Sequence, residues 1–130
     1  MSEKYKILVV DNNESIRLLL KTKLSKSNFD VYCAENVLEA FFKFIEEPFD
    51  LVLTDICMPG INGNNLARYI RNLRAEAPII AVTASPGLAN EIFDMVIEKP
   101  FGLKFLLDTV TYFLPEAKDI VDEQKLQLCI

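Results

Sequence analysis

Four short apolar runs in this chain each end beside a residue that could handle a phosphoryl group. They are residues 7–10 before Asp11, 51–54 before Asp55, 79–82 before Thr83 and 95–98 before Lys99. If the runs are parallel neighbours in one sheet, their C-terminal ends meet at one edge, where open α/β sheets bind ligands. Two carboxylates, a hydroxyl and an ammonium would then surround one small polar cleft. Such a set can bind a divalent metal and a phosphoryl group together.

The composition is that of a globular protein. The chain has 130 residues, 51% hydrophobic and 25% charged, which is enough for one domain with a real core. Its net charge of −5 opposes binding to nucleic acid or to anionic lipid, because both would repel it. No apolar stretch approaches the length of a membrane span, and the N-terminus lacks a signal-peptide pattern. We therefore expect a cytoplasmic protein.

Missing and rare residue types exclude several chemistries. Histidine is absent, which excludes a Ser-His-Asp triad, a His-ligated metal and a phosphohistidine relay within this chain. A phosphoryl donor would have to be another molecule. The cysteines are Cys33, Cys57 and Cys129, odd in number and widely spaced. That pattern favours free thiols in a reducing compartment.

Hydrophobic periodicity predicts that strands and helices alternate along the chain. Strands are expected at residues 6–10, 30–34, 51–55, 79–83 and 95–98. Helices are expected from a cap at Asn12 or Asn13 to about residue 25, and at residues 37–46, 64–73 and 102–114. Ser85 and Pro86 can start only a short fourth helix, with Ser85 as its cap. Because the connections are short, this order implies an α/β fold with a parallel sheet and helices on both faces.

The predicted domain ends where Pro115 stops the last helix. Residues 1–115 are expected to form one domain, and residues 116–130 a C-terminal tail or linker. Within the third long helix, Leu66, Ile70 and Leu73 recur at helical spacing, so they are expected to face inward.

Over about residues 5–114, the chain resembles a response regulator receiver domain, the CheY-like family. The most specific piece is the pattern Asp-x-x-Met-Pro-x-x-Asn-Gly at residues 55–63. The other matching pieces are residues 7–11, 82–84 and 99–101. All of these pieces occur in order, each at the end of an apolar run. The resemblance implies a flavodoxin-like, five-stranded parallel sheet with strand order 2-1-3-4-5.

The resemblance implies an acceptor and a metal site. Asp55 would attack phosphorus and form an aspartyl phosphate. Asp11, Asn12, Asp55 and the backbone carbonyl of Cys57 would hold Mg²⁺, which prefers oxygen ligands. In the family, the position of Asn12 is commonly a second acid, so this site has one formal negative charge fewer. Asn12 could equally be a helix cap, and an aspartate after a strand is ordinarily a turn residue.

The resemblance also implies contacts to the phosphoryl group. Lys99 would pair with a phosphoryl oxygen, and with Asp55 in the resting state. Thr83 would hydrogen-bond the phosphoryl group, and the backbone of the small residue Ala84 would approach it. Without the resemblance, Thr83 is an ordinary strand-end residue and Lys99 an ordinary surface lysine. The bond between Lys99 and Pro100 is expected to be cis, which would aim the lysine side chain.

Two departures from the family concern the output side. Val96 stands where the family often has Tyr or Phe, three residues before the lysine. The segment between Thr83 and Lys99 is also short, so its helix can have at most about two turns. We expect residues 84–95 to be the least stable part of the domain and to become ordered on activation.

The expected function is that of a response regulator receiver in a two-component phosphorelay. Asp55 would accept a phosphoryl group from a histidine kinase or phosphotransfer protein and switch a surface for a downstream protein or output domain. Such a protein assists its own phosphorylation and dephosphorylation but is not an enzyme with a separate substrate. Direct contact with nucleic acid or membrane is not expected, whereas a homodimer is possible.

Other classes of protein fit less well. A degenerate receiver, acting as a phosphorylation-independent interaction or dimerisation module, is favoured by Asn12 and Val96 and opposed by Asp55, Thr83 and Lys99. A phosphoaspartyl hydrolase of the haloacid dehalogenase type requires Asp-x-Asp, which residues 11–13 lack. A flavodoxin requires a phosphate loop after the first strand, and none is present.

Overall fold

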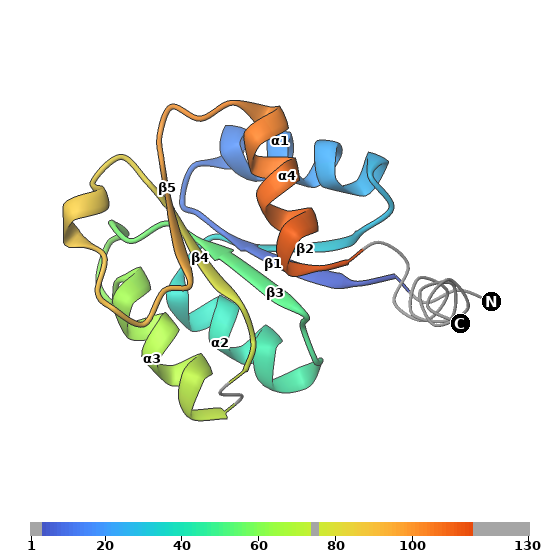
Figure 1. The fold of residues 1–130 in the computed structure, drawn as a ribbon. Coiled ribbons are helices and arrows are strands. Elements are labelled where there is room, and N and C mark those ends of the chain that lie inside the picture. Colours follow the sequence, from blue (N-terminus) through green and yellow to red (C-terminus); the bar gives the residue numbers. More distant parts are fainter. Residues whose placement is uncertain (1–3, 74–75, 116–130) are drawn as a thin grey trace, which may run out of the picture.

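Five parallel strands form one sheet through the middle of the molecule (Figure 1). The structure is a computed structural model that describes residues 4–73 and 76–115; the predicted tail and Cys129 lie outside these residues. The strand order is β2-β1-β3-β4-β5, as expected. The strands are β1 (Lys6–Val10), β2 (Asp30–Ala34), β3 (Leu51–Thr54), β4 (Ile79–Thr83) and β5 (Met95–Glu98).

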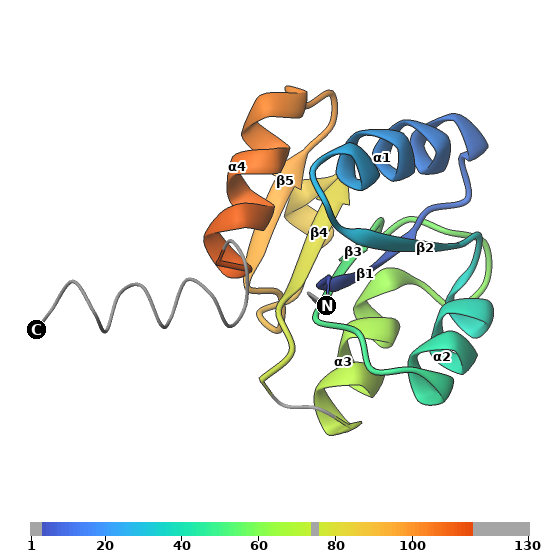
Figure 2. The same ribbon diagram turned by 90° about the vertical axis from the view of Figure 1, so that its right-hand side faces the viewer.

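Helices cover both faces of the sheet. They are α1 (Glu14–Lys26), α2 (Val37–Glu46), α3 (Gly63–Leu73) and α4 (Leu103–Phe113). Figure 2 shows α1 and α4 on one face of the sheet and α2 and α3 on the other. Among the helices of the described residues, none has the length and apolar character that crossing a membrane requires. The layers confirm the predicted fold class.

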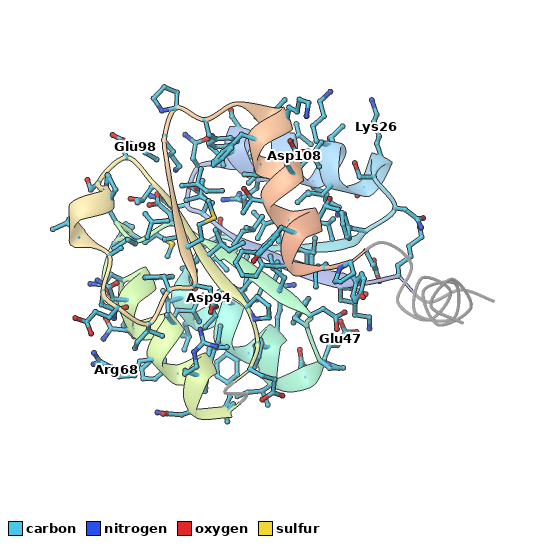
Figure 3. The ribbon with its side chains drawn as sticks, viewed as in Figure 1. Lys26, Glu47, Arg68, Asp94, Glu98 and Asp108 are labelled. Atoms are coloured by element: carbon cyan, nitrogen blue, oxygen red, sulfur yellow. The ribbon has the colours of Figure 1, made fainter. Side chains whose placement is uncertain are left out.

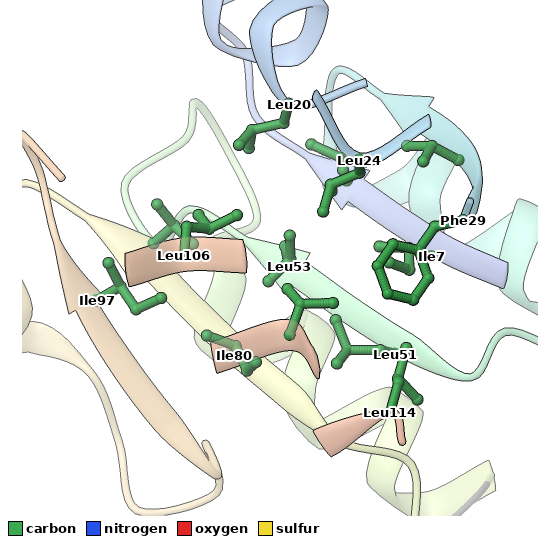
Figure 4. Close-up of a cluster of buried hydrophobic side chains, with 14 residues drawn as sticks. Ile7, Leu20, Leu24, Phe29, Leu51, Leu53, Ile80, Ile97, Leu106 and Leu114 are labelled. Carbon is green, nitrogen blue, oxygen red and sulfur yellow. The ribbon is translucent and has the colours of Figure 1, made fainter. Parts of the chain in front are cut away.

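The core has two halves because successive strand residues point to opposite faces of the sheet. Ile7 and Val9 of β1 pack with α1 and α4, in the cluster drawn in Figure 4. Leu8 and Val10 of the same strand pack with α2 and α3. A parallel strand covered on both faces is therefore apolar at every position. This is why the uninterrupted apolar runs of the sequence correspond to strands.

Polar side chains determine where two helices begin. The Asn13 side chain accepts hydrogen bonds from the backbone amides of Ser15 and Ile16, so Asn13 and not Asn12 caps α1. In α2, Asn36 accepts from the Glu39 amide, and the Glu39 carboxylate accepts from the Glu35 amide at 2.8 Å. This arrangement is a variant of the capping box, in which the Glu39 carboxylate reaches the amide of the residue before the cap.

The connection between β4 and β5 contains a single 3₁₀ turn, η1 (Pro86–Leu88), which confirms that the fourth helix is shortened. The expected cap is wrong, because the Ser85 side chain makes no cap hydrogen bond there. The expected inward position of Leu73 is also wrong, because that side chain is exposed at the end of α3.

Side chains of α3 hold this connection in place. The side-chain nitrogen of Asn64 donates to the Leu88 carbonyl at 2.9 Å, and the backbone amide of Asn90 donates to the Asn64 Oδ1 at 3.0 Å. Further along α3, Arg71 donates to the Ile92 carbonyl and pairs with Asp94 at 3.0 Å. A polar clamp from α3 therefore replaces part of the packing that a full helix would provide.

Gly63 lies where α3 begins against the loop that follows β3. Its amide donates to the Ile56 carbonyl at 2.9 Å. A Cβ atom added at Gly63 would lie 2.1 Å from the backbone oxygen of Asp55, which is far inside van der Waals contact. Only glycine therefore lets α3 approach the Asp55 loop this closely.

We predict that Gly63→Ala destabilises the protein by about 3 kcal/mol or more, because the methyl group meets backbone that cannot rotate away. Urea unfolding followed by circular dichroism measures the change. Gly87→Ala is the matched control, since a Cβ atom there meets nothing within 4 Å. Equal stabilities for the two variants would contradict the prediction.

Candidate functional site

Three charged residues meet at the C-terminal edge of the sheet. The Lys99 ammonium lies 2.7 Å from Asp11 Oδ2 and 3.1 Å from Asp55 Oδ2. Both carboxylates are nearly buried, with exposed fractions of 2% for Asp11 and 8% for Asp55. The expected ion pair of Lys99 with Asp55 is present, and Asp11 is the closer partner. Two anions thus share one cation in a largely desolvated cluster.

The loop after β3 fixes the Asp55 carboxylate. Its Oδ1 accepts hydrogen bonds from the backbone amides of Ile56 at 2.6 Å and Cys57 at 3.4 Å. The Asp55 amide donates to the Val10 carbonyl at 2.9 Å, and the Thr54 hydroxyl donates to the Asp55 carbonyl at 2.8 Å. One carboxylate oxygen is therefore held by the loop, and the other is turned toward Lys99.

Asp11 is held in a similar way by the start of α1. Its Oδ1 accepts from the Asn13 amide at 2.9 Å, so its Oδ2 is the oxygen that faces Lys99. Arg17 donates from Nη1 to the backbone carbonyl of Asp11 at 2.7 Å. Sequence reasoning missed Arg17, although its place one helical turn after Asn13 brings it back over the Asp11 loop. The arginine fixes the peptide that joins Asp11 to Asn12.

Lys99 is aimed by its own backbone. Its amide donates to the Thr83 carbonyl at 2.8 Å, and the Lys99-Pro100 bond is cis, as predicted. Burial alone would lower the pKa of Lys99, but hydrogen bonds to Asp11 and Asp55, together with their charges, outweigh it. The pKa is therefore raised above its ordinary value of 10.5. The ammonium stays charged throughout the neutral range.

Thr83 and Ala84 lie at the same edge but outside this cluster of charges. The fully buried Thr83 hydroxyl accepts a hydrogen bond from the Ser85 amide at 3.1 Å. Ala84 is exposed beside it. Thr83 is the last residue of β4 and Ala84 follows it, and β4 runs between β3 and β5. They are near the candidate acceptor in the fold, while the hydroxyl is engaged within its own loop.

Asn12 and Cys57 are exposed on the outer side of the cluster. Asn12 lines a pocket of about 470 Å³ together with Glu35–Leu38, Pro59 and Ile61. Within the part of the chain that the structure describes, no group of three or more His, Cys, Asp or Glu side chains could hold a metal ion. Asn12, where the family commonly has an acid, leaves two carboxylates and an amide oxygen. This donor set is all oxygen and fits a hard cation such as Mg²⁺.

The raised pKa of Lys99 predicts an alkaline loss of stability. The folded state holds the proton of the Lys99 ammonium more tightly than the unfolded state. The contribution of Lys99 to the free energy of unfolding is therefore complete below the unfolded pKa of about 10.4, and it is lost as pH rises through the higher folded pKa. The difference in free energy of unfolding between wild type and Lys99→Met should therefore be constant from about pH 8 to 9.5 and change above about pH 10.5 in favour of the variant.

Chemical unfolding at a series of pH values tests this. Lys104→Met is the control, because it removes an exposed pair with Asp108 that contributes little to stability. A difference for Lys99→Met that stays flat to pH 12 would contradict the prediction.

Comparisons with known proteins agree with this geometry. The family model of the response regulator receiver domain matches residues 7–111. Transcriptional regulatory protein ResD of Bacillus subtilis is 42% identical over 118 residues, which cover 86% of this chain and 49% of ResD. The chain therefore spans about half the length of that curated relative.

Two solved structures are also similar. Response regulator TrrA of Thermotoga maritima in complex with Mg²⁺-BeF is 38% identical, with a TM-score of 0.79, over 85% of this chain and 99% of that chain. The structure of the histidine kinase ThkA in complex with TrrA matches with 37% identity and a TM-score of 0.77, over 85% of this chain and 98% of that chain.

Proposed function

This chain belongs to the response regulator receiver domain family, and we propose that it accepts a phosphoryl group on Asp55 and thereby switches a protein-interaction surface. The observation that carries the proposal is the Lys99 ammonium shared by Asp11 and Asp55 at 2.7 and 3.1 Å. A nucleophilic carboxylate needs a neighbouring cation that can neutralise the charge of the incoming phosphoryl oxygens. Lys99 supplies that cation next to Asp55.

The phosphoryl donor is a phosphohistidine on a histidine kinase or a phosphotransfer protein. The absence of histidine in this chain and the solved complex of TrrA with ThkA support this assignment. A bond from an Asp55 carboxylate oxygen to phosphorus forms while the phosphorus–nitrogen bond of the donor breaks, and its electron pair stays on the imidazole nitrogen. Later attack by water on phosphorus returns the Asp55 carboxylate and inorganic phosphate.

Mg²⁺ is the proposed cofactor, supported by the oxygen donor set and by the Mg²⁺-BeF complex of TrrA. Asp11, Asn12, Asp55 and the backbone carbonyl of Cys57 would hold it. When bound, the ion supplies positive charge beside the phosphoryl oxygens. Asn12 is available for this role because Asn13 is the cap of α1.

Thr83 and the Ala84 backbone are the proposed phosphoryl contacts on the output side. To reach the phosphoryl group, the Thr83 hydroxyl would give up the hydrogen bond that it accepts from the Ser85 amide and donate one to a phosphoryl oxygen. That exchange would pull on residues 84–95, which we infer to be the segment that responds. Val96 leaves this response without an aromatic side chain that swings between two pockets.

We predict that acetyl phosphate with Mg²⁺ adds one phosphoryl mass to the wild type and none to Asp55→Asn, because an amide cannot act as the nucleophile. Intact-mass spectrometry measures the addition. Asp108→Asn, an exposed carboxylate on α4, should label like the wild type. Unlabelled wild type would favour the phosphorylation-independent module, and equal labelling of Asp55→Asn would show that Asp55 is not the acceptor.

We predict that Asn12→Asp tightens Mg²⁺ binding at least about fivefold. A charge pair about 4 Å apart is worth roughly 1–4 kcal/mol at the relevant dielectric constants. Calorimetric titration of each variant measures the affinity. Asn13→Asp adds the same charge one residue later and keeps the helix cap, so its effect should be smaller. Unchanged or weaker binding by Asn12→Asp would show that Asn12 does not face the ion.

A further inference from the structure

Helix α2 carries a second apolar stripe that does not face the sheet. Leu38, Phe42 and Ile45 are 59%, 57% and 55% exposed. Their spacing of four and three residues places them in one row along the helix. The opposite side of α2 already buries Val37, Ala40 and Phe44, so the exposed row is not needed for the core. A helix on the surface of a sheet normally presents polar residues at these positions.

The stripe continues onto α3, which lies beside α2 on the same face of the sheet (Figure 1). The rings of Phe41 and Tyr69 meet edge to face with centroids 5.5 Å apart, which joins the two helices. Tyr69 and Leu73 are exposed and lie one turn apart on α3. We call the exposed residues Leu38, Phe42, Ile45, Tyr69 and Leu73 the α2–α3 surface. A contiguous apolar area of this kind on a single chain marks an interaction site.

At the N-terminal end of α2, this surface adjoins the pocket that Asn12 lines. Leu38 lines both the surface and the pocket, where Pro59 and the exposed Ile61 join it. The pocket gives a side chain at one end of a bound helix a place to insert. The surface is therefore elongated along α2 and ends in a hollow.

The rim along α2 is acidic, whereas α3 carries the exposed Arg68 and no acidic residue. Glu39 and Glu46 are exposed on α2 on either side of Lys43, and Glu35, just before α2, pairs with Arg17 at 3.9 Å. Figure 3 shows Glu47 at the end of α2 and Arg68 on α3. The whole chain carries a net charge of −5. Charge complementarity therefore favours a basic partner.

An antiparallel contact with a second copy of this chain fits the acidic rim poorly. In such a two-fold contact centred on Phe42, Glu39 of each copy would lie opposite the end of α2 that carries Glu46. Like charges that face each other across an interface weaken it. The two acidic α2 rims would thus meet along one side of the apolar centre.

We infer that the α2–α3 surface docks an amphipathic helix of a partner protein, with apolar residues at positions i, i+3, i+4 and i+7 and lysine or arginine beside them. Helices of this type bind apolar grooves through such anchors. The contact is separate from phosphoryl transfer and does not depend on the role of Asp55.

A designed peptide tests the inference. The probe is a fluorescein-labelled 18-residue helical peptide with leucines at that spacing and lysines along the flank that would face Glu39 and Glu46; its control has the same residues in scrambled order. Fluorescence anisotropy with the full chain should give at least about tenfold tighter binding of the ordered peptide. Absence of binding, or equal binding of both peptides, would overturn the inference.

Variants then locate the contact. Phe42→Gln and Leu38→Gln should each weaken peptide binding about tenfold, and Glu39→Gln should weaken it less while reducing its salt dependence. Phe105→Gln is the matched control, a 52% exposed phenylalanine on α4, on the other face of the sheet. Because all of these side chains are exposed, urea unfolding should show near wild-type stability.

Two further outcomes would overturn the inference. One is an equal loss of peptide binding in Phe42→Gln and Phe105→Gln, which would indicate general stickiness. The other is self-association of the wild type in sedimentation velocity that Phe42→Gln abolishes, which would make a second copy the occupant.

Discussion

The Lys99 ammonium is the constraint on which the edge of this sheet depends. Asp11 and Asp55 are both nearly buried, and both carboxylates lie within 3.1 Å of this one ammonium. The lysine comes from β5, whereas its partners follow β1 and β3, so the side chain passes over the end of β4. Neighbouring strands are about 4.8 Å apart, so only a long side chain can make this crossing. At the end of β4, the Thr83 hydroxyl accepts a hydrogen bond from the Ser85 amide.

The same edge also shows how the backbone prepares the two carboxylates. In each case, amides of the following loop satisfy one oxygen, those of Ile56 and Cys57 for Asp55 and that of Asn13 for Asp11. The second oxygen is thereby directed at Lys99. Side chains fixed in this way need little reorganisation when a charged group arrives. The site's geometry is therefore a consequence of how the chain leaves β1 and β3.

Sequence patterns predicted the strands and the meeting of Asp11, Asp55 and Lys99, because buried parallel strands are continuously apolar and their ends must share an edge. The strand order came from the resemblance to the receiver family. They did not predict contacts that depend on three-dimensional placement. Periodicity predicted that Leu73 faces inward, but its side chain, at the last residue of α3, is 53% exposed. Arg17 was missed because its partner is a backbone carbonyl, which no residue type reveals. Ser85 was read as a cap, although a single 3₁₀ turn offers its side chain no such bond.

The shortened β4–β5 connection determines which elements are coupled to a displacement of Thr83. This segment is bound to α3 through hydrogen bonds from Asn64 to Leu88 and from Arg71 to Ile92. Helix α3 in turn begins at Gly63, whose amide bonds to the Asp55 loop. A continuous set of contacts thus links the Asp55 loop to α3, α3 to the β4–β5 connection, and that connection to Thr83. The Thr83 carbonyl in turn accepts a hydrogen bond from the Lys99 amide. A displacement of Thr83 therefore either strains the hydrogen bonds between the β4–β5 connection and α3 or moves α3 as well. Thr83 and the Asp55 loop are coupled in this way through α3.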